Sequence, residues 1–196
     1  LARFGDTAEF AQYFTSDEIR RIRSQASGDV HRAVVQCYRD RLPSGSRTKL
    51  YPFSLRKPSG NIHGLVFGAK NPLAFDKFLT VAWEQSVTNG EANFDIDQDA
   101  SKAQGVLFAE CRTMTKREQF AIEVAEYIRG QGTVTTKEMC LFAYDRGFLP
   151  KHAKEAVQEL KDKGSVSWGG RLALSYGNCI KNDRQQEIRW EHHGTE

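Results

Sequence analysis

The chain of 196 residues lacks the patterns that mark catalysis, secretion and membrane insertion. Its four cysteines include no CxxC pair, and no histidine pair stands at zinc-ligand spacing from them. No apolar run reaches the ~18 residues that a membrane span requires, and no signal peptide is visible. The sequence also contains no nucleophile elbow, P-loop, HExxH or GxGxxG motif. We therefore expect a cytoplasmic protein with reduced, mostly buried thiols, without a cofactor or a metal site.

The sequence also has little excess of charge of one sign. Its formal net charge is only +3, from 28 Lys and Arg against 25 Asp and Glu. A domain that coats nucleic acid by charge alone is more basic than this. Any binding to nucleic acid would therefore depend on Lys and Arg that gather locally on one surface.

The N-terminal part, residues 1–88, shows two helical segments and then a hairpin. The run Thr15-Ser16-Asp17-Glu18 is a capping box, in which the Thr hydroxyl and the Glu carboxylate each satisfy a backbone N–H at the start of a helix. Apolar residues at helical spacing predict a second helix from about Asp29 to Leu42. A further helix is predicted from Leu73 to about Gln85, after Asn71-Pro72.

Between these helices, Lys49–Leu55 and Ile62–Ala69 are rich in aromatic and β-branched residues and predict a β-hairpin. The loop Lys57–Asn61 has turn composition. The second strand is almost continuously apolar, so we expect it to be covered on both faces. A lone hairpin makes a poor core. Either residues 1–88 pack as a small α+β unit, or the rest of the sheet lies in sequence that this chain does not include, which is the alternative we favour.

The clearest pattern lies in residues 115–180. Capping boxes at Thr115–Glu118 and Thr135–Glu138 begin two helices, and Pro150 stands at the first position of a third. A short extended stretch at Thr133-Val134 separates the first two helices. After the third helix, Gly169-Gly170 predicts a two-residue turn that joins strands at Ser165–Trp168 and Arg171–Ser175. The order helix, strand, helix, helix, hairpin predicts a winged-helix domain.

In such a domain the third helix is the usual reading helix and the hairpin is the wing. We predict that its outward face and the wing tip contact phosphates through six basic residues: Lys151, His152, Lys154, Lys161, Lys163 and Arg171. Acidic residues on the same helix offset this charge, and residues 115–196 carry 13 Lys and Arg against 12 Asp and Glu. Contact with a protein inside a larger assembly and a purely structural role therefore stay open beside nucleic-acid binding.

The expected fold class is α+β, with a partial methyltransferase-like helix and hairpin segment followed by a winged helix. The expected division is 1–88 for the first unit, 89–114 for a linker, 115–180 for the winged helix and 181–196 for a disordered tail.

Two stretches carry a family resemblance. Tyr51-Pro52-Phe53 and the run from Gly64 to Leu73, GLVFGAKNPL, resemble the three-Cys-motif partner (TcmP) family of bacterial proteins, and the winged helix from Arg117 to Cys179 fits the end of that family. The resemblance implies an N-terminal Rossmann sheet like that of methyltransferases, of which this hairpin would be the last two strands. It also implies association with a radical-SAM-like partner that carries the three-cysteine motif. The glycine-rich loop that would bind S-adenosylmethionine is not in this chain, so no cofactor residue is carried over.

Three functions follow from these observations. The first is a non-catalytic binding module whose winged helix contacts nucleic acid, DNA in preference to RNA. The second is a fragment of an S-adenosylmethionine-dependent methyltransferase-like protein, which would be an enzyme only together with a missing N-terminal half. The third is a scaffold for the radical-SAM-like partner, which predicts an exposed apolar patch near Phe53, Leu65 and Phe67.

Overall fold

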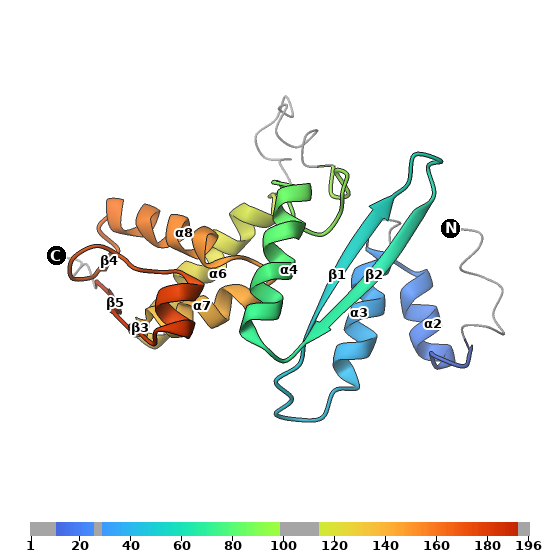
Figure 1. Cartoon of the computed structure of the whole chain (residues 1–196), viewed down its shortest axis with the longest axis horizontal. Coiled ribbons are helices and arrows are strands. Elements are labelled where there is room, and N and C mark those ends of the chain that lie inside the picture. Colours follow the sequence, from blue (N-terminus) through green and yellow to red (C-terminus); the bar gives the residue numbers. More distant parts are fainter. Residues whose placement is uncertain (1–10, 26–28, 99–113, 192–196) are drawn as a thin grey trace.

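The computed structural model describes residues 11–25, 29–98 and 114–191, and the fold in these ranges is mixed α+β, as the sequence predicts. The described residues form seven helices and two small antiparallel sheets (Figure 1). In chain order the elements are α2 (Ser16–Arg23), α3 (Val30–Asp40), β1 (Lys49–Arg56), β2 (Ile62–Ala69), α4 (Pro72–Gln85), α6 (Lys116–Gln131), β3 (Thr133–Thr135), α7 (Thr136–Asp145), α8 (Pro150–Asp162), β4 (Val166–Ser167), the π-helix η2 (Gly177–Lys181) and β5 (Glu187–Trp190). None of the helices in the described ranges combines the length and the hydropathy that a membrane span requires. Residues 99–113 of the expected linker and 192–196 of the expected tail lie outside the described residues.

Local capping chemistry places the starts of three helices where the sequence predicts them. The reciprocal capping box is present at Thr15 for α2, at Thr115 for α6 and at Thr135 for α7. In each box the threonine hydroxyl accepts from the backbone N–H of the glutamate three residues later, and the glutamate accepts from the threonine backbone. Helices α2 and α3 pack on each other through a small apolar cluster of Phe14, Ile22 and Cys37.

The predicted hairpin is confirmed, with Arg56 opposite Ile62 and Lys49 opposite Ala69. Helix α4 covers one face near the base of the hairpin, where Phe67 and Phe78 stack with ring centroids 4.2 Å apart. Helix α3 lies against the other face (Figure 1). The outer edge of β1 is also partly occupied, because Ser54 donates to the carbonyl of Glu91 at 2.7 Å and accepts from the backbone of Asn93 at 3.1 Å.

The prediction that the second strand is covered on both faces is wrong. Among the described residues nothing pairs with the outer edge of β2, and three of its apolar side chains are exposed: Ile62 by 51%, Leu65 by 46% and Val66 by 42%. The helices cover mainly β1 and the Phe67 end of β2. A continuous apolar run shows that a strand can be buried on both faces. Here the helices that cover the hairpin do not reach most of β2, so its apolar side chains stay exposed.

A single apolar core joins the hairpin and α4 to the C-terminal helices. Helix α4 lies between the hairpin and those helices (Figure 1). The Tyr51 hydroxyl donates to the carbonyl of Tyr144 at 3.0 Å, and the indole N–H of Trp83 donates to the carbonyl of Gly147 at 3.0 Å. Both donors belong to the same buried cluster as the inner faces of α6, α7 and α8. Segments on either side of the expected linker therefore pack directly against each other.

The C-terminal unit, residues 114–191, contains the three predicted helices and a three-stranded antiparallel sheet in the order β3-β5-β4. The predicted hairpin around Gly169-Gly170 is wrong. The partner of β4 is β5, with Val166 opposite Trp190, and Arg171–Ser175 forms no strand. In this irregular segment Leu172 and Leu174 are buried. The Gln186 amide takes the place of a neighbouring strand: its Nε2 donates to the carbonyls of Gly169 and Arg171, and its Oε1 accepts from the backbone N–H of Ala173.

The expected tail is also wrong over residues 187–190, because these residues form β5, the central strand of the sheet. Ile188 is fully buried there. The run Glu187-Ile188-Arg189-Trp190 offers only two apolar residues between charged ones, which is a weak strand signal in isolation. Its place is fixed by pairing with β3 and β4, both distant in sequence.

Candidate functional site

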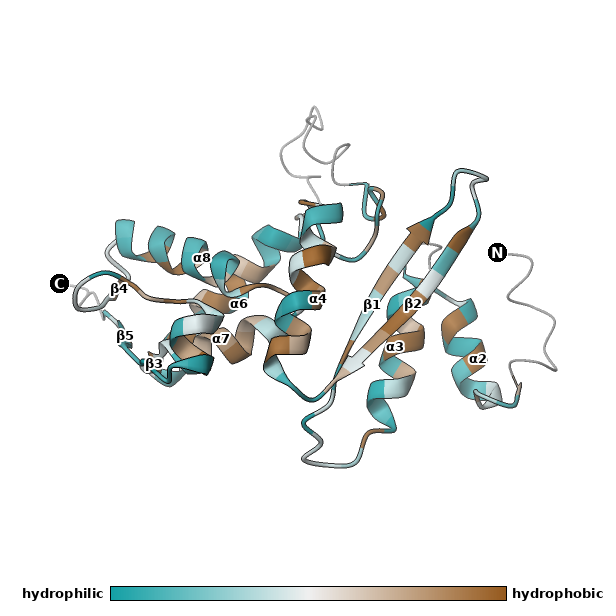
Figure 2. Cartoon of the chain, viewed as in Figure 1, coloured by the Kyte–Doolittle hydropathy of each residue, from teal (hydrophilic) through white to brown (hydrophobic). Residues whose placement is uncertain are grey.

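The candidate site is the exposed side of α8, where most of the predicted basic residues lie. Lys151, Lys161, Lys163 and Arg171 are exposed, and Lys154 is half-buried. Helix α8 begins at Pro150, whose missing N–H costs nothing at a helix start, and ends before Gly164, which has a φ of +75°. Its inner face buries Ala153, Ala156 and Val157. Figure 2 shows the hydrophilic outer side of α8.

Three of these lysines form a row. Lys151, Lys154 and Lys161 are three and seven residues apart, a spacing that places them on the same side of an α-helix. We call these three residues the α8 lysine row. Within the described residues none of the three has a carboxylate at ion-pair distance. Lys163 is the C-cap of the helix and lies outside the row.

The acidic residues of α8 occupy the neighbouring strip and are partly engaged elsewhere. Glu155 forms an ion pair with Arg117 of α6 at 2.6 Å. Asp162 accepts from the side-chain amide of Gln158 at 2.8 Å. Because Glu155 is paired with Arg117, it offsets the positive charge of the lysine row less than the number of acidic residues on α8 suggests. Helix α8 carries three lysines against three acidic residues, so the row is distinguished by its position on one side of the helix and not by the net charge of the helix.

An aromatic side chain that sequence reasoning missed lies beside the row. The Lys161 ammonium is 4.0 Å from the centroid of the Trp168 ring, a cation–π contact. Trp168 is half-buried, and it lines a shallow groove with Gly169, Gln186 and Arg189. The pairing of β4 with β5 creates this groove, so the sequence gives no signal for it. Arg171 is exposed further along the same loop, and among the described residues no hydrogen bond or ion pair joins it to the row.

The prediction that His152 lies on the outward face is wrong. His152 is only 6% exposed, and its ring lies 4.2 Å from the Trp83 ring. Its Nδ1 accepts from the backbone N–H of Leu149 at 3.2 Å, so the histidine caps the start of α8. Burial, together with the nearby charges of Arg117, Lys151 and Lys116, lowers the pKa of His152 from 6.5 to about 3. The ring is therefore neutral near pH 7 and does not contact phosphate.

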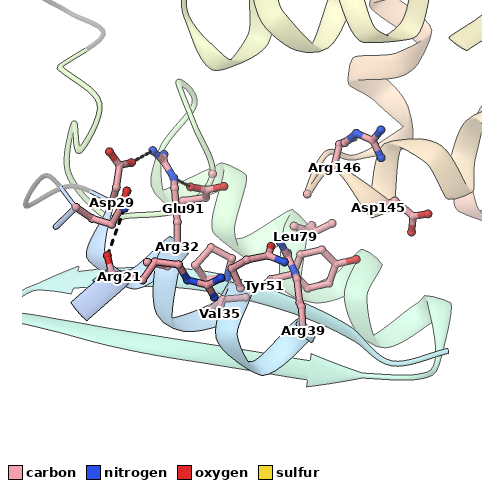
Figure 3. Close-up of a pocket in the computed structure, with 16 residues that line it drawn as sticks. Arg21, Asp29, Arg32, Val35, Arg39, Tyr51, Leu79, Glu91, Asp145 and Arg146 are labelled. Carbon is pink, nitrogen blue, oxygen red and sulfur yellow. Dashed lines mark hydrogen bonds and ion pairs between the residues drawn. The ribbon is translucent and has the colours of Figure 1, made fainter. Parts of the chain in front are cut away.

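A buried charge network that the sequence did not predict joins α3, α6 and the segment after α4. The Glu91 carboxylate accepts from Arg32 Nε at 2.6 Å and from Lys116 Nζ at 2.7 Å. Arg32 also pairs with Asp97 at 2.8 Å. It pairs with Asp29 at the same distance, a contact that Figure 3 shows. Burial opposes the charge of Glu91, but Lys116 and Arg32 outweigh it and hold the pKa of Glu91 well below its ordinary value. A carboxylate held in this way is a structural anion and not a general base.

The described residues contain no group of three or more His, Cys, Asp or Glu side chains that could hold a metal ion. Comparison with known family models, curated proteins and solved structures finds no match to this chain. The α8 lysine row with Trp168 beside it is therefore the feature from which a function can be argued.

Proposed function

We propose that the C-terminal unit is a winged helix that binds nucleic acid through α8, with duplex DNA preferred over RNA. The observation that carries the proposal is the α8 lysine row: Lys151, Lys154 and Lys161 lie on one exposed side, without a carboxylate partner among the described residues. Lysines that are not engaged in ion pairs are free to replace the counterions of a phosphate backbone. The DNA preference rests on the width of the major groove of B-form DNA, which admits a helix, whereas that of A-form RNA does not.

The element order and the strand pairing support the winged-helix proposal. Three helices are followed by two antiparallel strands, β4 and β5, and the short β3 between the first two helices pairs with β5. Helix α8 is the third helix of this unit, the position of the reading helix. The connection from β4 to β5 takes the place of the wing, and it carries Trp168 and Arg171.

The test is a fluorescence-anisotropy titration of the whole chain with a short labelled duplex DNA and with double-stranded RNA of the same length. We expect Lys151→Glu and Lys154→Glu together to weaken binding to every duplex sequence equally, because phosphate contacts carry no sequence information. Lys77→Glu is the matched control, since Lys77 is exposed on α4 and lies outside the C-terminal unit. Equal affinity of the double variant and the wild type would contradict the proposal, as would tighter binding to RNA.

A second candidate function is a scaffold for a protein partner, and the outer edge of β2 favours it. This edge is unpaired among the described residues and carries three exposed apolar side chains. Of the patch expected near Phe53, Leu65 and Phe67, Leu65 is exposed, Phe67 is half-buried and Phe53 is buried. An edge of this kind accepts an extended strand from another chain. The radical-SAM-like partner implied by the resemblance is the candidate that we propose to test.

The test for the scaffold is co-expression of the chain with a protein that carries the three-cysteine motif. We expect the two to co-purify, and Val66→Lys to abolish co-purification, since a charge on β2 disfavours strand addition. Lys77→Glu again serves as the control. Co-purification that survives Val66→Lys would show that β2 is not the contact. Methyltransferase-like activity stays a prediction from the resemblance alone.

A further inference from the structure

A cavity that the proposed function does not use lies between α2, α3, β1, the middle of α4, the segment that follows α4 and the turn at residues 145–147 (Figure 3). Its volume is about 500 Å³, which falls within the range of roughly 300–1,000 Å³ that small-molecule sites occupy. One wall is α3, which contributes Arg32, Val35 and Arg39 at the three- and four-residue spacing of a single helix face. The opposite wall is the turn between α7 and α8.

The inner part of the cavity is apolar and rigid. Its lining there includes Val35, Tyr51, Pro52 and Leu79, all of them buried. Tyr51 is fixed by its hydrogen bond to the carbonyl of Tyr144 and by contact with the rings of Phe75 and Phe78. This part of the cavity is therefore a preformed surface for an uncharged portion of a ligand, as in most small-molecule sites.

The carboxylates that line the cavity are all neutralised by the protein. Asp29 and Glu91 both pair with Arg32, and Glu91 pairs also with Lys116. Asp145 pairs with Lys49. None of these three groups is left without a cation, so the cavity has no unbalanced negative charge to offer a cationic ligand.

The arginines that line the cavity differ in whether a carboxylate already pairs with them. Arg32 is saturated by its three carboxylates, and Arg21 pairs with Asp40 at 3.0 Å. Arg146 forms an ion pair with Glu123 and lies over the Phe142 ring, so its charge is already paired within the C-terminal unit. Arg39 differs from these three.

The only hydrogen bond of Arg39 within the described residues is the one from Nη2 to the carbonyl of Leu50, at 2.5 Å. No carboxylate of those residues lies at ion-pair distance from it. Arg39 is exposed, but partial desolvation of its guanidinium lowers its pKa from the ordinary value, and the more distant charge of Glu91 offsets this only in part. A guanidinium carries five N–H donors in a planar fork, so most of the donors of Arg39 stay uncommitted.

We propose that this cavity binds a small organic anion, a phosphate monoester or a carboxylate, whose charged end is held by Arg39 and whose apolar part lies against Val35, Pro52 and Leu79. Arginine is the side chain best suited to hold two oxygens of such a group at once. The proposal is independent of the nucleic-acid surface, because no residue of the α8 lysine row lines the cavity.

The experiment uses phenyl phosphate as the probe and records backbone ¹H–¹⁵N NMR spectra of the full chain during a titration. We expect saturable shifts at Val35, Arg39, Leu79 and Gly147, with phenol, the uncharged analogue, binding much more weakly. We expect Arg39→Gln to weaken phenyl phosphate binding by roughly tenfold or more, because a hydrogen bond to a charged group contributes on the order of 1.5–3 kcal/mol. Arg39→Lys should recover part of the affinity, since it restores the charge without the fork.

Arg129→Gln is the matched control, because Arg129 is exposed on α6 and lines no part of the cavity. Arg39 lies at the rim and is itself exposed, so the variant is expected to fold, and thermal unfolding verifies this. Absence of saturable shifts at millimolar probe would overturn the proposal, and so would equal affinity of Arg39→Gln and the wild type. Shifts confined to α8 would assign the phosphate to the nucleic-acid surface instead. The double variant Lys151→Glu, Lys154→Glu should bind phenyl phosphate normally, so failure of one proposal is distinguishable from failure of the other.

Discussion

Replacement of Glu91 by Gln is expected to destabilise the fold substantially, because this carboxylate neutralises two cations from distant parts of the chain. The side chain of Glu91 is only 14% exposed, and those of Lys116 and Arg32 are 19% and 31% exposed. Removing one partner of a buried ion pair costs about 3–5 kcal/mol, because the remaining charge is left without compensation. Arg32 keeps Asp29 and Asp97, whereas Lys116 keeps only the carbonyl of Asn89 and the faces of Trp83 and Phe148. We therefore expect a loss near the lower end, about 3 kcal/mol.

Urea unfolding of wild type and Glu91→Gln measures this loss as a shift of the midpoint at an unchanged slope. The matched control is Glu187→Gln, in which the lost partner is the exposed Arg189 two residues away, and its expected effect is below about 1 kcal/mol. In the double variant Glu91→Gln, Lys116→Met the cost should fall, because the uncompensated ammonium is removed too. A change of less than about 1 kcal/mol in Glu91→Gln would refute the reasoning, since a surface pair loses that much.

The pH dependence gives the same network an independent test. The pKa of Glu91 in the folded chain lies below its ordinary value of 4.5. A depressed carboxyl pKa contributes stability that is present above the unfolded value and is lost as the pH falls toward the folded value. The difference in stability between wild type and Glu91→Gln should therefore be constant above pH 4.5 and should shrink as the pH is lowered below it. A difference that grows on acidification would contradict this account.

Two further predictions follow from single buried contacts. His152→Ala should lower the free energy of unfolding, measured with urea, by about 2–4 kcal/mol because packing on Trp83 is lost. Anisotropy titration should show an unchanged affinity for nucleic acid. A loss of affinity without a loss of stability would show that His152 belongs to the binding surface after all. Gly90→Ala should cost more than about 2 kcal/mol, because an added Cβ meets Trp83 at 2.6 Å and Gly90 has a φ of +64°. Gly170→Ala is the matched control: its φ is +68° and its Cβ meets nothing within 4 Å, so thermal unfolding should show only the strain of about 1 kcal/mol. Equal losses in the two glycine variants would show that the contact with Trp83 is relieved without cost.

The helices of this chain are predictable because their signals are local. Capping boxes at Thr15, Thr115 and Thr135 lie within four residues of the contacts that they make. The burial of His152 could also have been predicted from the local sequence. It stands four residues before the buried Ala156, at the border of the apolar stripe of α8, although its lysine neighbours favoured an exposed position.

The features that sequence reasoning missed depend on contacts between distant residues. Arg32 and Glu91 are 59 residues apart, and no spacing rule connects them. Strand β5 is recognisable only once β3 and β4 exist to pair with it. The groove beside Trp168 follows from that pairing. Each of these features is decided by tertiary packing, which overrides weak local preference.

The salt dependence of DNA binding tests the central proposal most directly. Each neutralised phosphate contributes about −0.9 to the slope of log K against log salt concentration. Changing Lys151, Lys154 and Lys161 together to Gln should therefore make that slope shallower by about 3, and a matched change of the exposed Lys57, Lys70 and Lys77 should leave it unaltered. A slope that changes equally in both triple variants, or in neither, would contradict the assignment of the α8 lysine row as the nucleic-acid surface.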